Sequence, residues 1–137
     1  MKRFKTACVS LCVLVATLSP TGAAAEGVRV PLSSDGVQRL EVTVDSYSFS
    51  PDRIVVKRDI PVEFILRSVA RFIPHNFVLT APDAGFQIKS ELRAGETVSI
   101  LFTPRRVGTL KFLCDKKLLF FKSHEEQGMV GALEVTE

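Results

Sequence analysis

Apolar and polar side chains alternate over many short stretches of this chain, and a period of two residues is typical of strands with one buried face. Turn-forming residues separate these stretches at intervals of about 8–12 residues, for example residues 33–36 (SSDG) and 82–85 (PDAG). We expect about seven or eight strands, drawn from residues 28–30, 40–44, 53–57, 61–67, 75–80, 86–92, 96–102, 109–113 and 130–135. This pattern predicts an all-β sandwich or barrel.

No stretch has the periodicity of an amphipathic helix of normal length. Residues 116–127 show some helical tendency, and they include the apolar run 118–121 (LLFF). The sequence contains no repeat and no low-complexity tract, and residues 26–137 suffice for one domain with one core. We therefore expect a single domain that is monomeric.

The first 25 residues have the composition of a secretory signal peptide. Three basic residues lie within the first five positions, an apolar run covers residues 7–18, and three alanines end at Ala25. The alternative is a retained membrane anchor, but the apolar run is short for a hydrocarbon core of about 30 Å. We predict cleavage after Ala25, a domain of residues 26–137 in the periplasm, and no membrane span after cleavage.

The charge of the chain changes once the signal peptide is set aside. The whole chain has 18 Lys and Arg against 15 Asp and Glu, a formal net charge of +3. Residues 1–25 hold three of the basic residues and none of the acidic ones, so residues 26–137 have 15 of each. A balanced charge gives no support for nucleic-acid binding, which normally uses a clustered basic face.

Residues 26–137 contain one cysteine, Cys114, since Cys8 and Cys12 lie in the predicted signal peptide. Neither of those two has a convincing lipobox around it. Thiols in exported proteins tend to pair, so a lone thiol there requires an explanation. Cys114 alone is consistent with a buried structural residue, half of an intermolecular disulfide, or a metal ligand.

The neighbours of Cys114 favour the metal ligand. Residues 112–131 (FLCDKKLLFFKSHEEQGMVG) also hold His124 and Met129, and the second histidine of the chain is His75. Thiolate and thioether sulfur are soft donors and imidazole is intermediate, a set that suits copper better than calcium or magnesium. Taken singly, His75 is more simply a strand histidine, and Met129 and Cys114 are more simply core residues. Their joint order and spacing predict a mononuclear copper site, with zinc as the weaker alternative.

Three motifs resemble the cupredoxin family. Residues 74–77 (PHNF) resemble its first-histidine motif, and His124 and Met129 are separated by four residues, as in plastocyanin-type members. Residues 47–51 (YSFSP) with 54–57 (IVVK) resemble the opening strands of bacterial periplasmic members. The resemblance covers residues 40–136 and implies a Greek-key β-sandwich with copper at one end. It also implies that Asn76 stiffens the ligand loops and hydrogen-bonds around the thiolate sulfur.

One spacing departs from the plastocyanin and azurin pattern. Nine residues (115–123) separate Cys114 from His124, where those relatives have only a few. We expect a short helix or a long loop there. A binuclear copper centre would need a second cysteine at position 118, which is leucine. The apolar run 118–121 either packs onto the end of the barrel or forms an exposed patch for a redox partner.

These features favour a periplasmic electron carrier that cycles between Cu(I) and Cu(II). Its expected partner is a redox protein such as a cytochrome or an oxidase. The alternative is a copper protein for delivery, storage or sensing, or an accessory domain of a copper or iron transport system. We do not expect an enzyme, because a catalytic copper needs further histidines and both of those present are already used.

Overall fold

A computed structural model of the chain describes residues 26–137, and the predicted signal peptide, residues 1–25, lies outside them. Ten strands form two facing sheets, and a single 3-10 turn, η1 (Pro82–Ala84), is the one helical element among the described residues. Between residues 26 and 137, no helix has the length and apolarity needed to cross a bilayer. The predicted all-β sandwich is confirmed.

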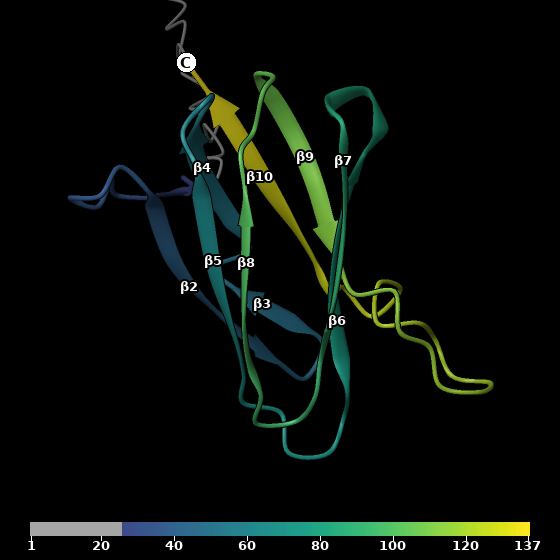
Figure 1. Cartoon of the computed structure of the whole chain (residues 1–137). Coiled ribbons are helices and arrows are strands. Elements are labelled where there is room, and N and C mark those ends of the chain that lie inside the picture. Colours follow the sequence, from purple (N-terminus) through teal and green to yellow (C-terminus); the bar gives the residue numbers. More distant parts are fainter. Residues whose placement is uncertain (1–25) are drawn as a thin grey trace, which may run out of the picture.

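The larger sheet has six strands and the smaller has four (Figure 1). Their order is β1-β4-β10-β9-β6-β7 in the larger sheet and β3-β2-β5-β8 in the smaller one. The strands are β1 (Val28–Arg29), β2 (Gln38–Asp45), β3 (Ser48–Ser50), β4 (Arg53–Lys57), β5 (Val62–Ser68), β6 (His75–Ala81), β7 (Phe86–Leu92), β8 (Thr97–Phe102), β9 (Gly108–Leu113) and β10 (Val130–Thr136). Only β3 has no counterpart among the predicted stretches, because three residues are too few to show a periodic pattern.

The chain passes repeatedly from one sheet to the other, so both sheets are mixed. β10 lies inside the larger sheet, parallel to β4 and antiparallel to β9. β2 pairs with β5 in parallel in the smaller sheet. The last strand of the chain therefore joins segments that are far apart in the sequence.

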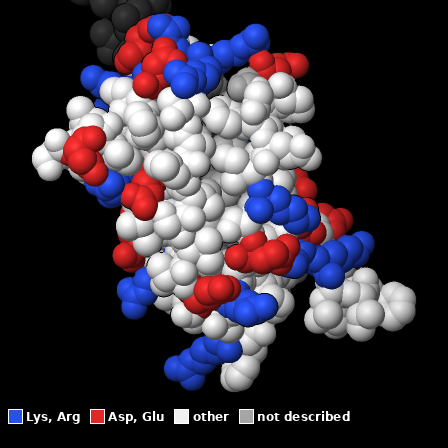
Figure 2. Space-filling view, viewed as in Figure 1, with Lys and Arg blue, Asp and Glu red and all other residues white. Residues whose placement is uncertain are grey.

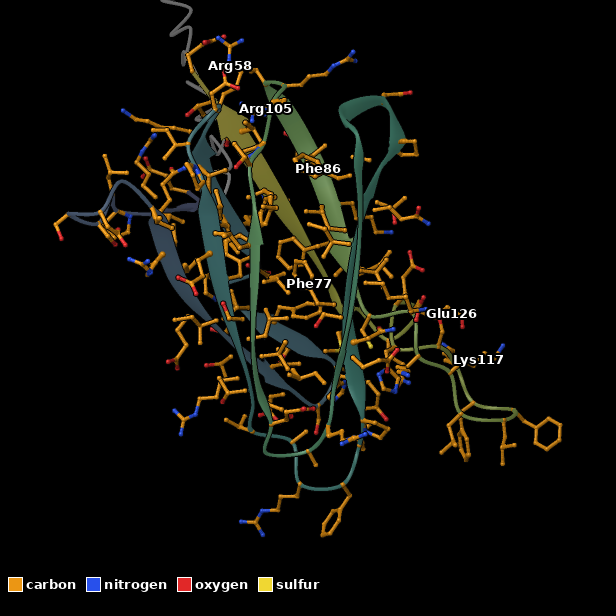
Figure 3. All side chains as sticks on the ribbon, in the orientation of Figure 1. Arg58, Phe77, Phe86, Arg105, Lys117 and Glu126 are labelled. Carbon is orange, nitrogen blue, oxygen red and sulfur yellow. The ribbon has the colours of Figure 1, made fainter. Side chains whose placement is uncertain are left out.

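The core lies between the sheets and follows the predicted alternation. In β5, Val62, Phe64 and Leu66 are fully buried while the residues between them are not. The rings of Phe77 and Phe112 stack with centroids 5.2 Å apart, and Figure 3 shows Phe77 in the space between the two sheets. Burying a large apolar side chain stabilises the fold by roughly 1.5–3 kcal/mol, so this core is what holds the two sheets together.

Three strand ends meet at one end of the sandwich. β6 begins at His75, β9 ends one residue before Cys114, and β10 begins one residue after Met129. The segment between β9 and β10 contains turns and no helix, so the long loop that we gave as one of two possibilities is the one observed. Figure 1 shows this loop, in yellow-green, projecting beyond the side of the sandwich.

Candidate metal centre

Three donor atoms converge in the interior at this end of the sandwich. His75 Nδ1, Cys114 Sγ and His124 Nδ1 all lie within 4.8 Å of one another. His124 Nδ1 is 3.1 Å from His75 Nδ1 and 3.3 Å from Cys114 Sγ, and Cys114 Sγ is 4.0 Å from His75 Nδ1. All three side chains are buried. The nine-residue spacing therefore does not displace His124 from the site.

The arrangement fits a metal ion with soft and intermediate ligands. Nitrogen and thiolate ligands bind such ions at about 2.0 to 2.3 Å, so two ligands of one ion lie roughly 3 to 4 Å apart. The three distances here fall in that range. Two imidazoles and one thiolate with a nearby thioether suit one copper ion. The residues present fit the cofactor that the sequence predicts.

The position of His75 is fixed because it is the first residue of a strand and pairs with a neighbouring strand. It opens β6 opposite Leu92 of β7, and its side chain is fully buried. Its Nε2 atom has no hydrogen-bond partner among the described residues. A buried ring nitrogen without a partner is uncommon and is tolerated mainly at functional sites. The other ring nitrogen, Nδ1, faces His124 and Cys114.

Cys114 is held by its backbone and by the strand beside it. Its backbone N–H donates to the carbonyl of Met129 at 3.1 Å, which extends the β9–β10 pairing by one step. The backbone N–H of Asn76 donates to Cys114 Sγ at 3.4 Å. This contact stabilises a thiolate, and it matches the kind of hydrogen bond that the resemblance implies for Asn76.

The Asn76 side chain makes a second connection, to the residue after the cysteine. Its Nδ2 donates to Asp115 Oδ1 at 2.6 Å, and the Asp115 backbone N–H donates to Asn76 Oδ1 at 3.0 Å. Lys89 Nζ binds the other carboxylate oxygen of Asp115 at 2.7 Å. These contacts fix the start of the long loop against β6 and thereby fix the orientation of Cys114.

A compact turn carries His124. Its backbone N–H donates to the Lys116 carbonyl at 2.8 Å, and its carbonyl accepts from the Met129 N–H at 2.9 Å. Gly128, with φ of 94°, allows the turn to reverse in a conformation that side chains disfavour. Tyr47 packs edge-on against the His124 ring, with centroids 5.0 Å apart and an interplanar angle of 89°.

Met129 lies beside both of the loop ligands. Its backbone bonds to Cys114 and to His124, and its side chain is fully buried. These positions bring the thioether to the same end of the sandwich as the three donor atoms. Its role as a copper ligand stays a prediction.

The surroundings keep the metal-free donors uncharged. Burial, together with the nearby His124, lowers the pKa of His75 to about 4. Burial and the Lys116 charge lower the pKa of His124. Burial raises the pKa of the Cys114 thiol, and the Asn76 N–H opposes that rise only in part. Neutral imidazoles are ready to bind a cation, whereas the thiol must first lose its proton.

Sequence reasoning missed two residues of this site. Asp115 follows Cys114 directly, but only the pairing of β6 with β9 shows that it faces Asn76. Tyr47 is the single tyrosine of the chain, and nothing in the sequence connects it with His124. Its φ of 62° lies in the left-handed region, which a tyrosine rarely adopts.

The apolar run 118–121 is exposed, so of its two interpretations the packing onto the barrel end is wrong and the exposed patch is the one observed. It borders a groove of about 550 Å³. The groove is lined by residues of three segments, among them Tyr47, Phe72, Leu118, Phe121 and His124. His124 thus both supplies a candidate donor atom and lines this groove.

Comparisons with known proteins agree with the fold. A family model described as a cupredoxin-like domain matches residues 8–130. None of the curated proteins matches the chain.

Solved structures show the same fold. The metal-binding domain of the Cu(I)-exporting P-type ATPase CopA of Streptococcus pneumoniae is 22% identical, with a TM-score of 0.60 over 83% of this chain and 99% of that one. Auracyanin of Roseiflexus castenholzii is 17% identical, with a TM-score of 0.60 over 72% and 97%. The copper-containing nitrite reductase of Thermus scotoductus is 21% identical, with a TM-score of 0.54 over 81% of this chain and 28% of that one.

Proposed function

This chain belongs to the cupredoxin-like domain family, and we propose that it is a periplasmic electron carrier with one copper ion. His75, Cys114 and His124 would hold the ion, and the Met129 thioether would supply a fourth, weaker ligand. The observation that carries the proposal is the convergence of His75 Nδ1, Cys114 Sγ and His124 Nδ1 within 4.8 Å in a buried space.

The protein side chains supply a rigid and dry environment. Copper, when bound, supplies a one-electron couple between Cu(I) and Cu(II). β6 positions His75, the end of β9 positions Cys114, and backbone hydrogen bonds within the β9–β10 loop position His124, so the ligands would need to move little between oxidation states. The Asn76 N–H donates to the thiolate and lowers its electron density, which tunes the potential. His124 borders the groove and is the ligand that a redox partner approaches.

The test is a visible and EPR spectrum of the protein with added Cu(II). We expect a strong thiolate charge-transfer band with one copper per chain. Cys114→Ser should abolish the band and leave the fold intact. A strong band that survives Cys114→Ser would refute the assignment.

A second candidate is a copper protein for delivery, storage or sensing, or a part of a metal-uptake system. The long loop that carries His124 favours it, because a ligand on a loop is easier to withdraw than one on a strand. Reaction with a cytochrome separates the two candidates. Slow electron exchange combined with rapid transfer of Cu(I) to a chelating acceptor would favour copper handling.

We propose no catalytic role for the chain. Copper nitrite reductases and multicopper oxidases need further histidines for a catalytic copper, and both histidines of this chain belong to the one centre. Export is also part of the proposal. It is tested by mass spectrometry of the protein from a periplasmic extract, where a chain that begins at Glu26 is expected and an intact residue 1–25 segment would contradict it.

A further inference from the structure

The tip of the β9–β10 loop, residues 118–121 (LLFF), exposes four consecutive apolar side chains. Phe120 is 99% exposed, and Leu118, Leu119 and Phe121 are between 64% and 75% exposed. Figure 3 shows the loop leaving the body of the protein near Lys117 and reaching well beyond the sheets. Soluble monomeric proteins rarely expose such a contiguous apolar group unless it binds something.

The backbone of the tip is arranged to present these side chains. The Phe121 N–H donates to the Leu118 carbonyl at 3.0 Å and closes a four-residue turn. Leu119 has a φ of 46°, a left-handed conformation that costs a leucine free energy and a glycine almost none. The turn therefore has an apolar side chain at a position where glycine would adopt the backbone conformation at a lower cost in free energy. Its internal hydrogen bond also suits a surrounding with little water.

Positive charge surrounds the base of the tip. Lys116, Lys117 and Lys122 flank it, and residues 116–123 contain no acidic side chain. Lys116 pairs with Glu91 at 2.5 Å, but no described residue forms an ion pair with Lys117 or Lys122. Glu126 lies nearer the sandwich, where its carboxylate accepts from the Ser123 N–H. Figure 2 shows an uncharged lobe at this side of the molecule with basic side chains beside it.

A second loop adds to the same surface. Phe72, between β5 and β6, is 89% exposed, and the exposed Arg71 precedes it. Phe72 lines the same groove as Leu118 and Phe121. Two loops at the metal end of the sandwich thus each present apolar side chains next to cations.

We propose that residues 118–121 insert into the interfacial region of an anionic lipid bilayer. Phenylalanine and leucine at the headgroup boundary, with lysines among the phosphates, are the combination that binds proteins to membrane surfaces. A protein partner or a second copy of this chain needs a pocket shaped to receive a projecting tip, whereas a bilayer needs none. Binding in this way does not depend on bound copper.

The test uses tryptophan as a local probe, because the chain contains none. Phe120→Trp keeps an aromatic side chain at the tip. The vesicles are phosphatidylcholine and phosphatidylglycerol at 3:1, with and without brominated acyl chains. We expect a blue shift of the emission and quenching by the brominated lipid, with metal-free and copper-loaded protein alike. Val107→Trp, in the turn at the opposite end of β9, is the matched control and should show neither change.

Two further variants in the Phe120→Trp chain separate the tip from general adsorption. Leu119→Gly should need roughly tenfold more lipid for half-maximal quenching while thermal unfolding stays unchanged or improves. The double variant Lys117→Gln and Lys122→Gln should need roughly thirtyfold more lipid for half-maximal quenching. Added salt should also raise the amount of lipid that is needed. The proposal would be overturned if lipid caused no blue shift of the emission from tryptophan at position 120, or an equal blue shift at position 107. A shift without lipid that grows with protein concentration, or that requires an added acceptor protein, would overturn it too.

Discussion

Asn76 and Asp115 bind each other through two hydrogen bonds, one from the Asn76 amide to the Asp115 carboxylate and one from the Asp115 backbone to the Asn76 amide oxygen. The pair joins the start of β6, which carries His75, to the residue after Cys114. It therefore fixes two of the candidate ligands relative to each other through neighbours that bind no metal themselves.

Asn76→Ala removes both bonds and should lower the free energy of unfolding by about 1–3 kcal/mol. Copper affinity should fall by about 10- to 100-fold, because the orientation of Cys114 is less well fixed. Denaturant unfolding of the metal-free protein and competition with a chelator measure the two effects. Lys89→Ala is the matched control, since it removes an exposed partner of Asp115 and should change neither quantity. Equal behaviour of the two variants would contradict this role for Asn76.

Met129→Leu should keep the copper and raise the reduction potential. Leucine has nearly the volume of methionine, so the buried site keeps its packing. The lost thioether is an electron donor, and its loss disfavours the oxidised ion. Protein-film voltammetry and copper analysis measure the outcome. Complete loss of copper would mean that Met129 is not a weak axial ligand.

The metal-free protein should lose stability as the pH falls from 6.5 toward 4. His75 has a pKa of about 4 in the fold, against a usual value of 6.5. Between these values the unfolded chain binds a proton that the folded chain does not. The contribution of His75 to the free energy of unfolding is therefore complete above pH 6.5 and declines as the pH falls below it. The loss from His75 is at most about 3 kcal/mol, and His124 acts in the same direction.

Urea unfolding at pH 7.5, 6 and 5 measures this loss. His75→Gln should reduce the dependence on pH, because glutamine does not titrate. An unfolding midpoint that stays constant over this range in the original chain would show that the two imidazoles are not buried in their neutral form.

Copper binding should release about one proton per ion at pH 7. Burial raises the pKa of the Cys114 thiol, so the metal-free protein holds a proton there that the thiolate ligand lacks. The apparent affinity should rise about tenfold for each pH unit above 6.5, and it should change more steeply at lower pH, where the histidines also take up protons. Calorimetry in buffers of different ionisation enthalpy counts the protons. Binding without release would exclude Cys114 as a thiolate ligand.

The sequence predicted the strands well where burial is one-sided, because alternation then records which face meets the core. Residues 109–113 and 130–135 are examples, and their ends place Cys114 and Met129 at one end of the sandwich. Alternation did not predict β3, since three residues carry no period. It also failed for residues 118–121, because the burial of a loop depends on whether a neighbouring surface exists to cover it. The contact between Tyr47 and His124 depends on how the two sheets face each other, which no local pattern contains.

The position of β10 between β4 and β9 determines when the protein can complete its folding. A chain that stops short of residue 130 has its six-stranded sheet divided into two separate pieces, with the parallel pairing to β4 and the antiparallel pairing to β9 both missing. During synthesis, most of the chain emerges before the strand that unites these pieces. We therefore expect the complete sheet to form only after residues 130–136 have arrived, and metal loading to follow that step.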